Sequence, residues 1–341
     1  MTLWIFFIAL APENPFIDDM HMKNLFCLTL IIMQALVSAC GKGISPEDGQ
    51  NPEGEVSIVV ATFNVLKPAN RITEMSMDNP IVRKALAGTI ASAKADLIGF
   101  NEVDETHIPG GKYSLQAMCA SIKNYQWSLQ WPNRPDAEGK NLKYNYADGF
   151  AYNSATLEME ECGYVWLSKE EDTWYTNPAD AYQKCGNPER TCLWVRFKHI
   201  ASGKIFWAFP THLPHPDHGG ALNMAKVVNR FAAEKAGAAP AILFGDMNSS
   251  RSHEPDVYNT LIDYWRDGNI NARWGTMSGS SDKYYYPWET YSGGHPERRI
   301  DHILTKGCSA SDFRRIIVTY PIDDVQWYPS DHLAITATVK L

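Results

Sequence analysis

Residues 241–248 join an apolar run directly to a polar pair, and this junction constrains the fold more than any other stretch of the chain. The run 241–244 predicts a short buried strand. Gly245 permits an unusual backbone turn at the end of that strand, so Asp246 and Asn248 are expected to project toward the same open space. A carboxylate beside a carboxamide suits a site that holds a hard metal ion together with an anionic substrate. Strand ends of this kind are common, so their significance depends on the other motifs of the chain.

Further polar clusters lie beside apolar, strand-like runs. They are Thr62-Phe63-Asn64, Phe100-Asn101-Glu102, Thr211-His212-Leu213, Arg299-Ile300-Asp301-His302 and Ser330-Asp331-His332. The polar residues of the first three clusters follow predicted strand ends, whereas Asp331 and His332 precede a predicted strand. Where neighbouring strands run in opposite directions, the end of one strand and the start of the next share an edge of the sheet. These side chains are therefore expected to meet at one rim of the fold.

The order of the predicted elements indicates an α/β chain of the α+β type. Strands are predicted over residues 56–63, 97–100, 149–152, 191–198, 205–209, 241–244, 300–305, 313–318 and 334–339. Helices are predicted from Asn79-Pro80 onward, with Ile81, Ala85, Leu86, Ile90 and Ala93 on one buried face, over 222–236, and from Glu254-Pro255 through Trp265. Hairpins mixed with helical crossovers predict two mixed sheets packed face to face with helices outside, which is a four-layer α-β-β-α sandwich.

The composition fits a large globular chain with an acidic balance. The 341 residues are 45% hydrophobic and carry a formal net charge of −8. That charge argues against a protein that grips long nucleic acid nonspecifically, because such affinity comes largely from contacts of Lys and Arg with phosphate. A local basic cleft is not excluded.

The amino terminus has the pattern of a targeting sequence over residues 1–39. A short charged segment at Met22-Lys23 precedes the apolar run 25–35, and Val37-Ser38-Ala39-Cys40 closes it. This ending resembles a bacterial lipoprotein signal, in which Cys40 would be lipidated and become the first mature residue. An ordinary signal peptide, or a buried helix with an incidental cysteine, is the alternative interpretation.

The lipoprotein interpretation predicts how the chain is organised and where it is located. Residues 1–21 are expected to be a start assigned too early, 40–54 a flexible tether, and 55–341 the catalytic domain. The protein is then expected in the bacterial cell envelope, periplasmic or surface-exposed, with a lipid anchor to the membrane.

The cysteines after Cys40 are odd in number, so they cannot all pair. They are Cys119, Cys162, Cys185, Cys192 and Cys308. No CxxC pattern suggests zinc. In an oxidising compartment a disulfide between Cys185 and Cys192 could close a small loop.

At the polar clusters the chain resembles the endonuclease/exonuclease/phosphatase superfamily, which includes deoxyribonuclease I, and the resemblance extends from about Val56 to Leu341. The motifs occur in the family's order: TFNV at 62–65, NEVD at 101–104, DGFAY at 148–152, THL at 211–213, GDMN at 245–248, IDHIL at 300–304 and SDH at 330–332. The chain departs from the family where it has Asn101 in place of Gln, His302 in place of a frequent Tyr, and Ala334 in place of a common Pro. These departures remove no charge and no proton acceptor.

The resemblance implies a deoxyribonuclease I-like fold and hydrolysis of phosphate esters with Mg²⁺, for which Mn²⁺ is a possible substitute. It gives His332 the role of general base, Asp301 that of orienting His332, and Asp246 that of orienting or deprotonating the attacking water. Asn248 and His212 would donate to phosphate oxygens. Metal-site roles fall to Glu102 as main ligand, Asn64 in support, and Asp331 as ligand or support.

The substrate is less constrained than the reaction. Trp288 and Tyr291 lie just before the IDHIL motif, where the family places substrate-facing side chains, and they could stack on a base, inositol or sugar. Nucleic acid, phospholipid head groups and phosphorylated sugars or inositols all remain as substrates. His212, His215 and His218 suggest a metal cluster, although a surface loop fits that segment better. The rival function is a catalytically inactive, surface-tethered binding module of the same fold for a polyanion or glycan.

Overall fold

The computed structural model describes residues 55–66, 78–103, 118–119, 122–130, 134–135, 141–142, 147–167, 174–175, 190–215, 220–272, 274, 276, 299–323 and 325–341. All of these residues belong to the unit Gly54–Leu341. The predicted signal region and tether, with Cys40, lie outside the described residues, as do Trp288, Tyr291 and His218.

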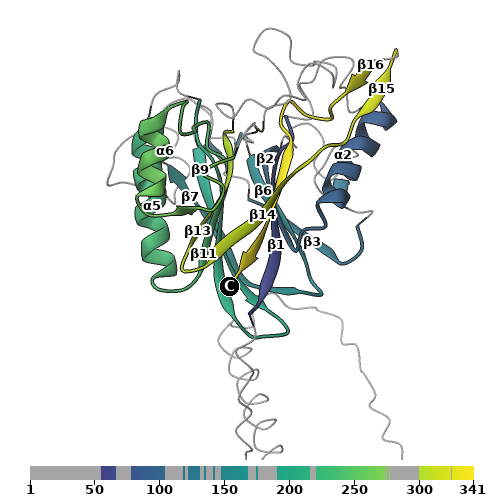
Figure 1. The fold of residues 1–341 in the computed structure, drawn as a ribbon. Coiled ribbons are helices and arrows are strands. Elements are labelled where there is room, and N and C mark those ends of the chain that lie inside the picture. The colour runs from purple at the N-terminus through teal and green to yellow at the C-terminus, as the bar shows by residue number, and fades with distance from the viewer. Residues whose placement is uncertain are drawn as a thin grey trace, which may run out of the picture. The chain divides into compact units, whose positions relative to one another are not determined.

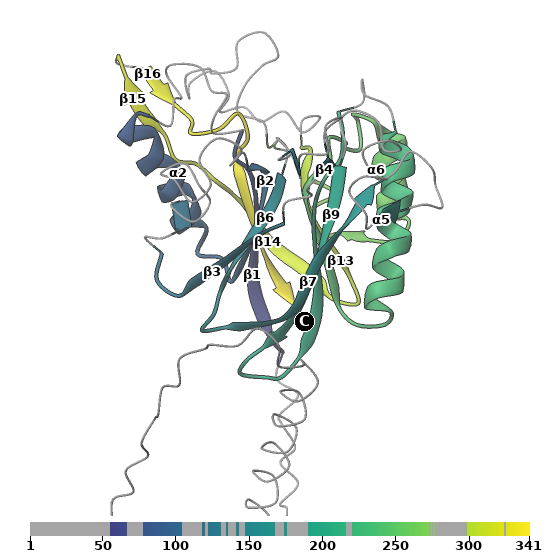
Figure 2. The ribbon, with the colours of Figure 1, turned by 180° about the vertical axis from the view of Figure 1, so that it is seen from behind.

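Two mixed sheets contain most of the described strands (Figures 1 and 2). The six-stranded sheet has the order β14 (Ser309–Ile316), β17 (Ala334–Lys340), β1 (Ser57–Asn64), β2 (Leu97–Val103), β6 (Ala147–Asn153), β3 (Tyr125–Gln130). The seven-stranded sheet has the order β12 (Arg266–Asp267), β13 (Asp301–Lys306), β11 (Ala241–Asp246), β10 (Ile205–His212), β9 (Arg190–His199), β7 (Leu157–Leu167), β8 (Trp174–Tyr175). Two short pairs, β15 (Tyr320–Ile322) with β16 (Val325–Trp327) and β4 (Arg134–Pro135) with β5 (Asn141–Leu142), complete the strands.

Helices cover the outer face of each sheet, as Figure 1 shows. Helix α2 (Pro80–Ala93) packs on the six-stranded sheet, while α5 (Ala221–Ala236) and α6 (Pro255–Ile262) pack on the seven-stranded one. A third apolar cluster, which includes Val60, Phe197 and Phe244, fills the space between the sheets. Alternate residues of each strand therefore enter different cores. The predicted four-layer α-β-β-α sandwich is confirmed.

Local signals placed most elements correctly, with differences that have physical causes. Asn79 caps α2 as predicted, since its side chain accepts a hydrogen bond from the Ile81 N–H at 2.9 Å. Ile81, however, is 46% exposed, and Val82 takes its place on the buried face one turn before Leu86. Helix α6 ends at Ile262, so Trp265 lies beyond it, buried and donating to the Asn229 side chain at 2.9 Å.

Strand β7 was missed because its first half is rich in Glu and several of these side chains are exposed, so it lacks a buried apolar run. The sequence left a Cys185–Cys192 disulfide open, and Cys192 does not form one in this structure. Cys192 is a free, fully buried thiol on β9, and Cys185 lies outside the described residues.

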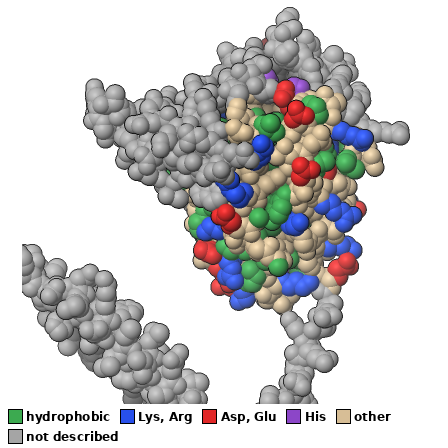
Figure 3. Space-filling view, turned by 90° about the vertical axis from the view of Figure 1, so that its left-hand side faces the viewer, with side chains coloured by type: hydrophobic (Ala, Val, Ile, Leu, Met, Phe, Trp, Pro, Cys, Tyr) green, Lys and Arg blue, Asp and Glu red, His purple; other side chains and the backbone are tan. Residues whose placement is uncertain are grey.

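Charges of both signs are interspersed on the face that carries α5 and α6 (Figure 3). Among the described residues of this face, the pattern gives no single-sign track for a nucleic-acid backbone. Among the described residues, no helix has the length and apolar character needed to cross a bilayer.

Candidate active site

Strand pairing brings the predicted polar residues to one rim. β1 and β2 run parallel with Asn64 opposite Asn101, and β10 and β11 run parallel with His212 opposite Asp246. β13 runs antiparallel to β11 and begins there, with Asp301 opposite Asp246. The carboxyl ends of two parallel pairs and the amino end of an antiparallel strand thus share an edge, as the sequence predicted.

Gly245 has the conformational role that the sequence assigned to it. Its φ is 144°, and a Cβ added there would lie 1.8 Å from the Thr211 carbonyl oxygen of the neighbouring strand. Only glycine allows β10 and β11 to approach so closely at this point. The close approach brings His212 and Asp246 together at the ends of their strands.

Asn101 joins the two sheets directly behind the site. Its amide nitrogen donates to Asp148 Oδ1 at 2.7 Å and to the Thr211 carbonyl oxygen at 3.1 Å. Its amide oxygen accepts the backbone N–H of Asp246 at 2.9 Å. The residue is 1% exposed, so these contacts satisfy a buried amide and fix the end of β11 against the end of β2.

Glu102 occupies an irregular position at the end of β2. The register between β2 and β6 shifts between Phe100 and Val103, which marks a bulge, and Glu102 has a φ of 57°. A left-handed conformation is unfavourable for a residue with a Cβ and is often found at functional sites. Bulges re-aim side chains. Here the carboxylate reaches Asn64 Nδ2, whose nitrogen lies 3.2 Å from Glu102 Oε1.

Asn64 bridges two carboxylates. Its amide nitrogen donates to Glu102 Oε1 and, at 3.0 Å, to Asp246 Oδ2, while its amide oxygen accepts the Leu66 N–H at 3.0 Å. Asn64 is fully buried. Its contacts bring Glu102 of one sheet and Asp246 of the other to a common point.

His332 lies between two aspartates. Its Nδ1 is 2.8 Å from Asp301 Oδ2, and its Nε2 is 3.6 Å from Asp246 Oδ2. Because Asp301 accepts at Nδ1, that nitrogen carries the proton and Nε2 faces Asp246. Asp301 thus orients the imidazole, and the alternative orienting residue, Asp331, is half-buried with its Oδ1 3.4 Å from the Ser330 hydroxyl.

Hydroxyl groups hold this arrangement in place. Ser330 Oγ donates to the Asn64 carbonyl oxygen at 2.7 Å and accepts the His332 N–H at 3.2 Å. Thr276 Oγ1 accepts the backbone N–H groups of Ile300 and Asp301, each at 3.2 Å. The backbone on both sides of the His332–Asp301 contact is therefore fixed.

Burial and charge shift the titration of these groups. Burial lowers the pKa of His332, but the charges of Asp301 and Asp246 and the hydrogen bond to Asp301 outweigh it and raise that pKa well above its usual value. Burial raises the pKa of Asp246, and the His332 charge opposes this. Burial also raises the pKa of Asp148 to about 7. Burial is thus the main cause at the two aspartates, and carboxylate charge is the main raising cause at His332.

His212 and Asn248 contact each other. The Asn248 amide nitrogen lies 3.2 Å from His212 Nε2 and 2.8 Å from the Leu213 carbonyl oxygen, and the Asn248 N–H donates to Asp246 Oδ1 at 2.9 Å. Asn248 has a φ of 46°, a conformation that Asn tolerates better than most residues. A ligand contacted by both side chains would take the place of their mutual contact.

A second buried polar group lies behind Asn248. His302 Nε2 is 2.8 Å from the Ser249 carbonyl oxygen, and His302 Nδ1 is 3.2 Å from Arg299 Nη1. A carbonyl oxygen only accepts and a guanidinium only donates, so His302 is neutral with its proton on Nε2. Burial, followed by the Arg299 charge, lowers the pKa of His302 to about 4. Arg299 in turn donates to Asp267 Oδ2 at 2.6 Å.

The residues present fit a divalent cation. Asp246, Asp301 and His332 offer ligand atoms that all lie within 4.8 Å of one another, and Glu102 joins them through Asn64. Asp301 Oδ1 is buried and has no hydrogen-bond partner among the described residues. Concentrated carboxylate oxygens are the ligands that Mg²⁺ prefers. A cation here would offset the carboxylate charge that raises the pKa of His332, so the ring would more readily be neutral and able to accept a proton.

Other predicted positions are placed less centrally or lie outside the described residues. His215 is exposed, with its ring centroid 6.4 Å from that of His253. Trp288, Tyr291 and His218 are not among the described residues, so the predicted stacking wall and histidine cluster stay predictions.

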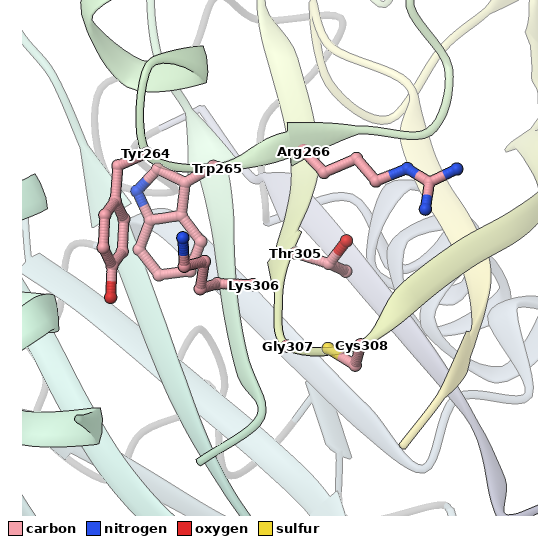
Figure 4. A pocket seen from close by; sticks show the side chains of 7 residues that line it. All are labelled: Tyr264, Trp265, Arg266, Thr305, Lys306, Gly307 and Cys308. Carbon is pink, nitrogen blue, oxygen red and sulfur yellow. The ribbon is translucent and has the colours of Figure 1, made fainter. Parts of the chain in front are cut away.

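A cavity of about 490 Å³ lies elsewhere, at the opposite end of β13 from Asp301 (Figure 4). Its lining includes Lys306, whose ammonium lies 4.7 Å from the Tyr264 ring centroid, and Cys308. Burial raises the pKa of the Cys308 thiol to about 11, so the thiol is a poor nucleophile near neutral pH. The Asp246, Asp301 and His332 group lies away from this cavity, at the other end of β13.

Sequence reasoning missed several supporting residues. Asn101 and Ser330 stood inside quoted motifs but were given no role, and Asp148 opens the DGFAY motif. Arg299 also stood inside a quoted cluster without a role, whereas Thr276 and Asp267 gave no recognisable signal, because their contacts join segments far apart in sequence.

Comparisons with known proteins give a family match and a set of similar folds. Residues 61–332 match the sequence model of the Endonuclease/Exonuclease/phosphatase family. A comparison with curated proteins gave no match.

Solved structures share the fold. An endonuclease/exonuclease/phosphatase family protein from Bacteroides thetaiotaomicron is 19% identical, with a TM-score of 0.66, and the match covers 84% of this chain and 96% of that chain. A mannosyl-6-phosphatase from the same organism is 19% identical, with a TM-score of 0.65 and coverage of 83% and 99%. TDP2 from D. rerio, complexed with single strand DNA product, is 15% identical, with a TM-score of 0.57 and coverage of 84% and 99%.

Proposed function

Because this chain belongs to the endonuclease/exonuclease/phosphatase family, we propose that it is a metal-dependent hydrolase of phosphate esters that uses His332 as its general base. The observation that carries the proposal is the Asp301–His332–Asp246 arrangement, with contacts of 2.8 and 3.6 Å at the two ring nitrogens of His332. Asp301 holds one nitrogen, and the other faces Asp246, the residue that would orient the attacking water, which is an arrangement suited to proton transfer.

Each residue has a chemical task in this proposal. Asp301 fixes the His332 tautomer and stabilises the imidazolium after the ring has taken a proton from the attacking water. Asp246, held by Asn101 and Asn64, orients that water.

The other side of the site would bind the phosphoryl group. His212 and Asn248 exchange their mutual contact for hydrogen bonds to nonbridging phosphate oxygens, where negative charge develops in the transition state.

Glu102 would be the main ligand of a Mg²⁺ or Mn²⁺ ion. Asn64 supports Glu102 through its amide N–H, and Asp331 serves as ligand or support. When bound, the cation supplies Lewis-acid polarisation of the phosphoryl group and neutralises charge. His332 Nδ1 donates its proton to Asp301 Oδ2. That proton competes with a metal ion for the lone pairs of these two atoms. This favours Glu102 over His332 as a ligand.

Purified residues 41–341 should hydrolyse bis-p-nitrophenyl phosphate or p-nitrophenyl phosphate with Mg²⁺ or Mn²⁺, and EDTA should abolish turnover. A panel of mannose 6-phosphate, DNA, RNA, sphingomyelin and inositol phosphates at fixed metal concentration then separates monoester from diester activity. Mannose 6-phosphate and DNA are included because one similar structure is named as a mannosyl-6-phosphatase and another as a complex with a DNA product. Binding of a polyanion or glycan without hydrolysis of any ester would instead support the inactive binding module.

We further propose that Cys40 is lipidated and that the protein is anchored in a bacterial cell envelope. Support comes from the apolar run 25–35 and the small residues before Cys40.

A further inference from the structure

We propose that the buried side chains of Arg299 and His302 are positioning residues for the Asn248 amide. The inference rests on the proposed function, in which Asn248 contacts the substrate phosphate. Arg299 and His302 reach Asn248 only through the loop that carries it, residues 247–254 between β11 and α6.

The loop holds Asn248 in a left-handed backbone conformation, with a φ of 46°. Hydrogen bonds on both sides of Asn248 hold this turn in place. On one side of Asn248, the Met247 N–H donates to the Ile300 carbonyl oxygen at 2.8 Å. On the other side, His302 Nε2 donates to the Ser249 carbonyl oxygen at 2.8 Å. Ile300 and His302 therefore hold Met247 and Ser249, the residues on either side of Asn248, by hydrogen bonds.

Arg299 determines which proton His302 offers. Because its guanidinium donates to Nδ1, the ring must keep its proton on Nε2, where it faces the Ser249 carbonyl oxygen. The opposite tautomer would turn a lone pair toward that oxygen and repel it.

Arg299 is itself fixed by a buried ion pair. Its Nη2 donates to Asp267 Oδ2 at 2.6 Å, and the Tyr258 hydroxyl donates to the same oxygen at 2.6 Å. Arg299 is 5% exposed and His302 0% exposed, so water does not offer substitute partners.

The position of His302 on β13 links the loop to the catalytic pair. Successive residues of a strand point to opposite faces, so Asp301 turns toward His332 while His302 turns toward Ser249. The first two residues of β13 thus act on two groups: Asp301 orients the His332 imidazole on one side of the site, and His302 positions the Asn248 amide on the other.

A double-mutant cycle with bis-p-nitrophenyl phosphate tests the link. His302→Phe keeps a ring but removes both hydrogen bonds, and it should lower kcat/KM by about tenfold or more. In the Asn248→Ala background the same substitution should cost less than about twofold, because the group it positions is gone. His302→Gln, which can still donate to the Ser249 carbonyl oxygen, should retain most activity. Additive losses would overturn the proposal.

Hydrogen exchange of residues 247–254 provides a readout that needs no activity. Exchange there should accelerate in His302→Phe and in Arg299→Lys, which shortens the reach to His302. The control is Thr89→Ala, which removes a buried hydrogen bond of 3.0 Å to the Ala85 carbonyl oxygen in α2 and should leave this segment unchanged. Unchanged exchange in His302→Phe would overturn the positioning role. A wild-type protein without phosphoesterase activity would overturn the proposed function alone.

Discussion

The Nδ1 of His332 lies 2.8 Å from Oδ2 of Asp301, although the two residues come from opposite sides of the sandwich. Asp301 opens β13 of the seven-stranded sheet, and His332 lies two residues before β17 of the six-stranded sheet. The contact therefore forms only when the sheets are packed, and the predicted base acquires its orienting carboxylate through tertiary folding.

Removing this base should abolish most turnover. His332→Ala should lower kcat by roughly 10²–10⁴-fold, which is the contribution expected of a general base. Asp301→Asn should also lower kcat strongly, although less than His332→Ala does, because an amide at position 301 favours the wrong tautomer of His332. Steady-state kinetics with a p-nitrophenyl ester measures both. His199→Gln, in the β9–β10 hairpin, is the control and should be silent; equal rates for wild type and His332→Ala would remove the assignment.

Glu102→Gln should raise the concentration of Mg²⁺ or Mn²⁺ needed for half-maximal activity. The substitution keeps an oxygen that can accept from Asn64 but removes the charge that attracts the cation. A metal titration of activity measures the change, with the exposed Glu158→Gln as matched control. Superimposable titrations for wild type and Glu102→Gln would show that the ion binds elsewhere.

Gly245→Ala should destabilise the fold severely. The new Cβ would lie 1.8 Å from the Thr211 carbonyl oxygen, at a φ of 144°. The expected loss exceeds about 4 kcal/mol, since strands β10 and β11 must separate to relieve it. Gly203→Ala is the control, because its Cβ would meet nothing within 4 Å. This substitution should cost only about 1 kcal/mol, for placing Ala in a left-handed backbone conformation. Urea denaturation of both variants tests the difference, and equal losses would contradict it.

Protonation of His302 should lower the free energy of unfolding as the pH becomes acidic. Its pKa is about 4 in the folded protein, below the usual 6.5, so the unfolded chain binds the proton more readily. The stabilisation is complete above pH 6.5 and is lost as pH falls toward 4, by roughly 3 kcal/mol in total. His302→Gln does not titrate there, so the stability gap between it and wild type should shrink along that interval. A gap that is constant in urea titrations at successive pH values would disprove the assignment.

Cys40→Ser should leave the protein unlipidated and released from membranes. Cell fractionation with fatty-acid labelling measures both properties. Cys27→Ser, within the predicted apolar region, is the matched control and should keep the label. Membrane retention of the Cys40→Ser protein would count against a lipid anchor.

The sequence determined the strand ends and the residue types that stand on them. Buried runs such as 241–244 ending in Gly-Asp-x-Asn are local signals, because alternation, turn residues and caps act over a few positions. The order of the elements then indicated two packed sheets. The same signals predicted that Asn64, Glu102, His212, Asp246 and His332 meet at one rim.

Only the tertiary structure decided how these groups are held. The Asn101 amide spans both sheets, Thr276 fixes the start of β13, and Arg299 selects the proton of His302. Each is a contact between segments far apart in the chain, whose partner is set by sheet packing and not by neighbouring residues. A short-range pattern can name the polar side chains of a site, but which oxygen or nitrogen each one faces depends on the buried surroundings that folding assembles.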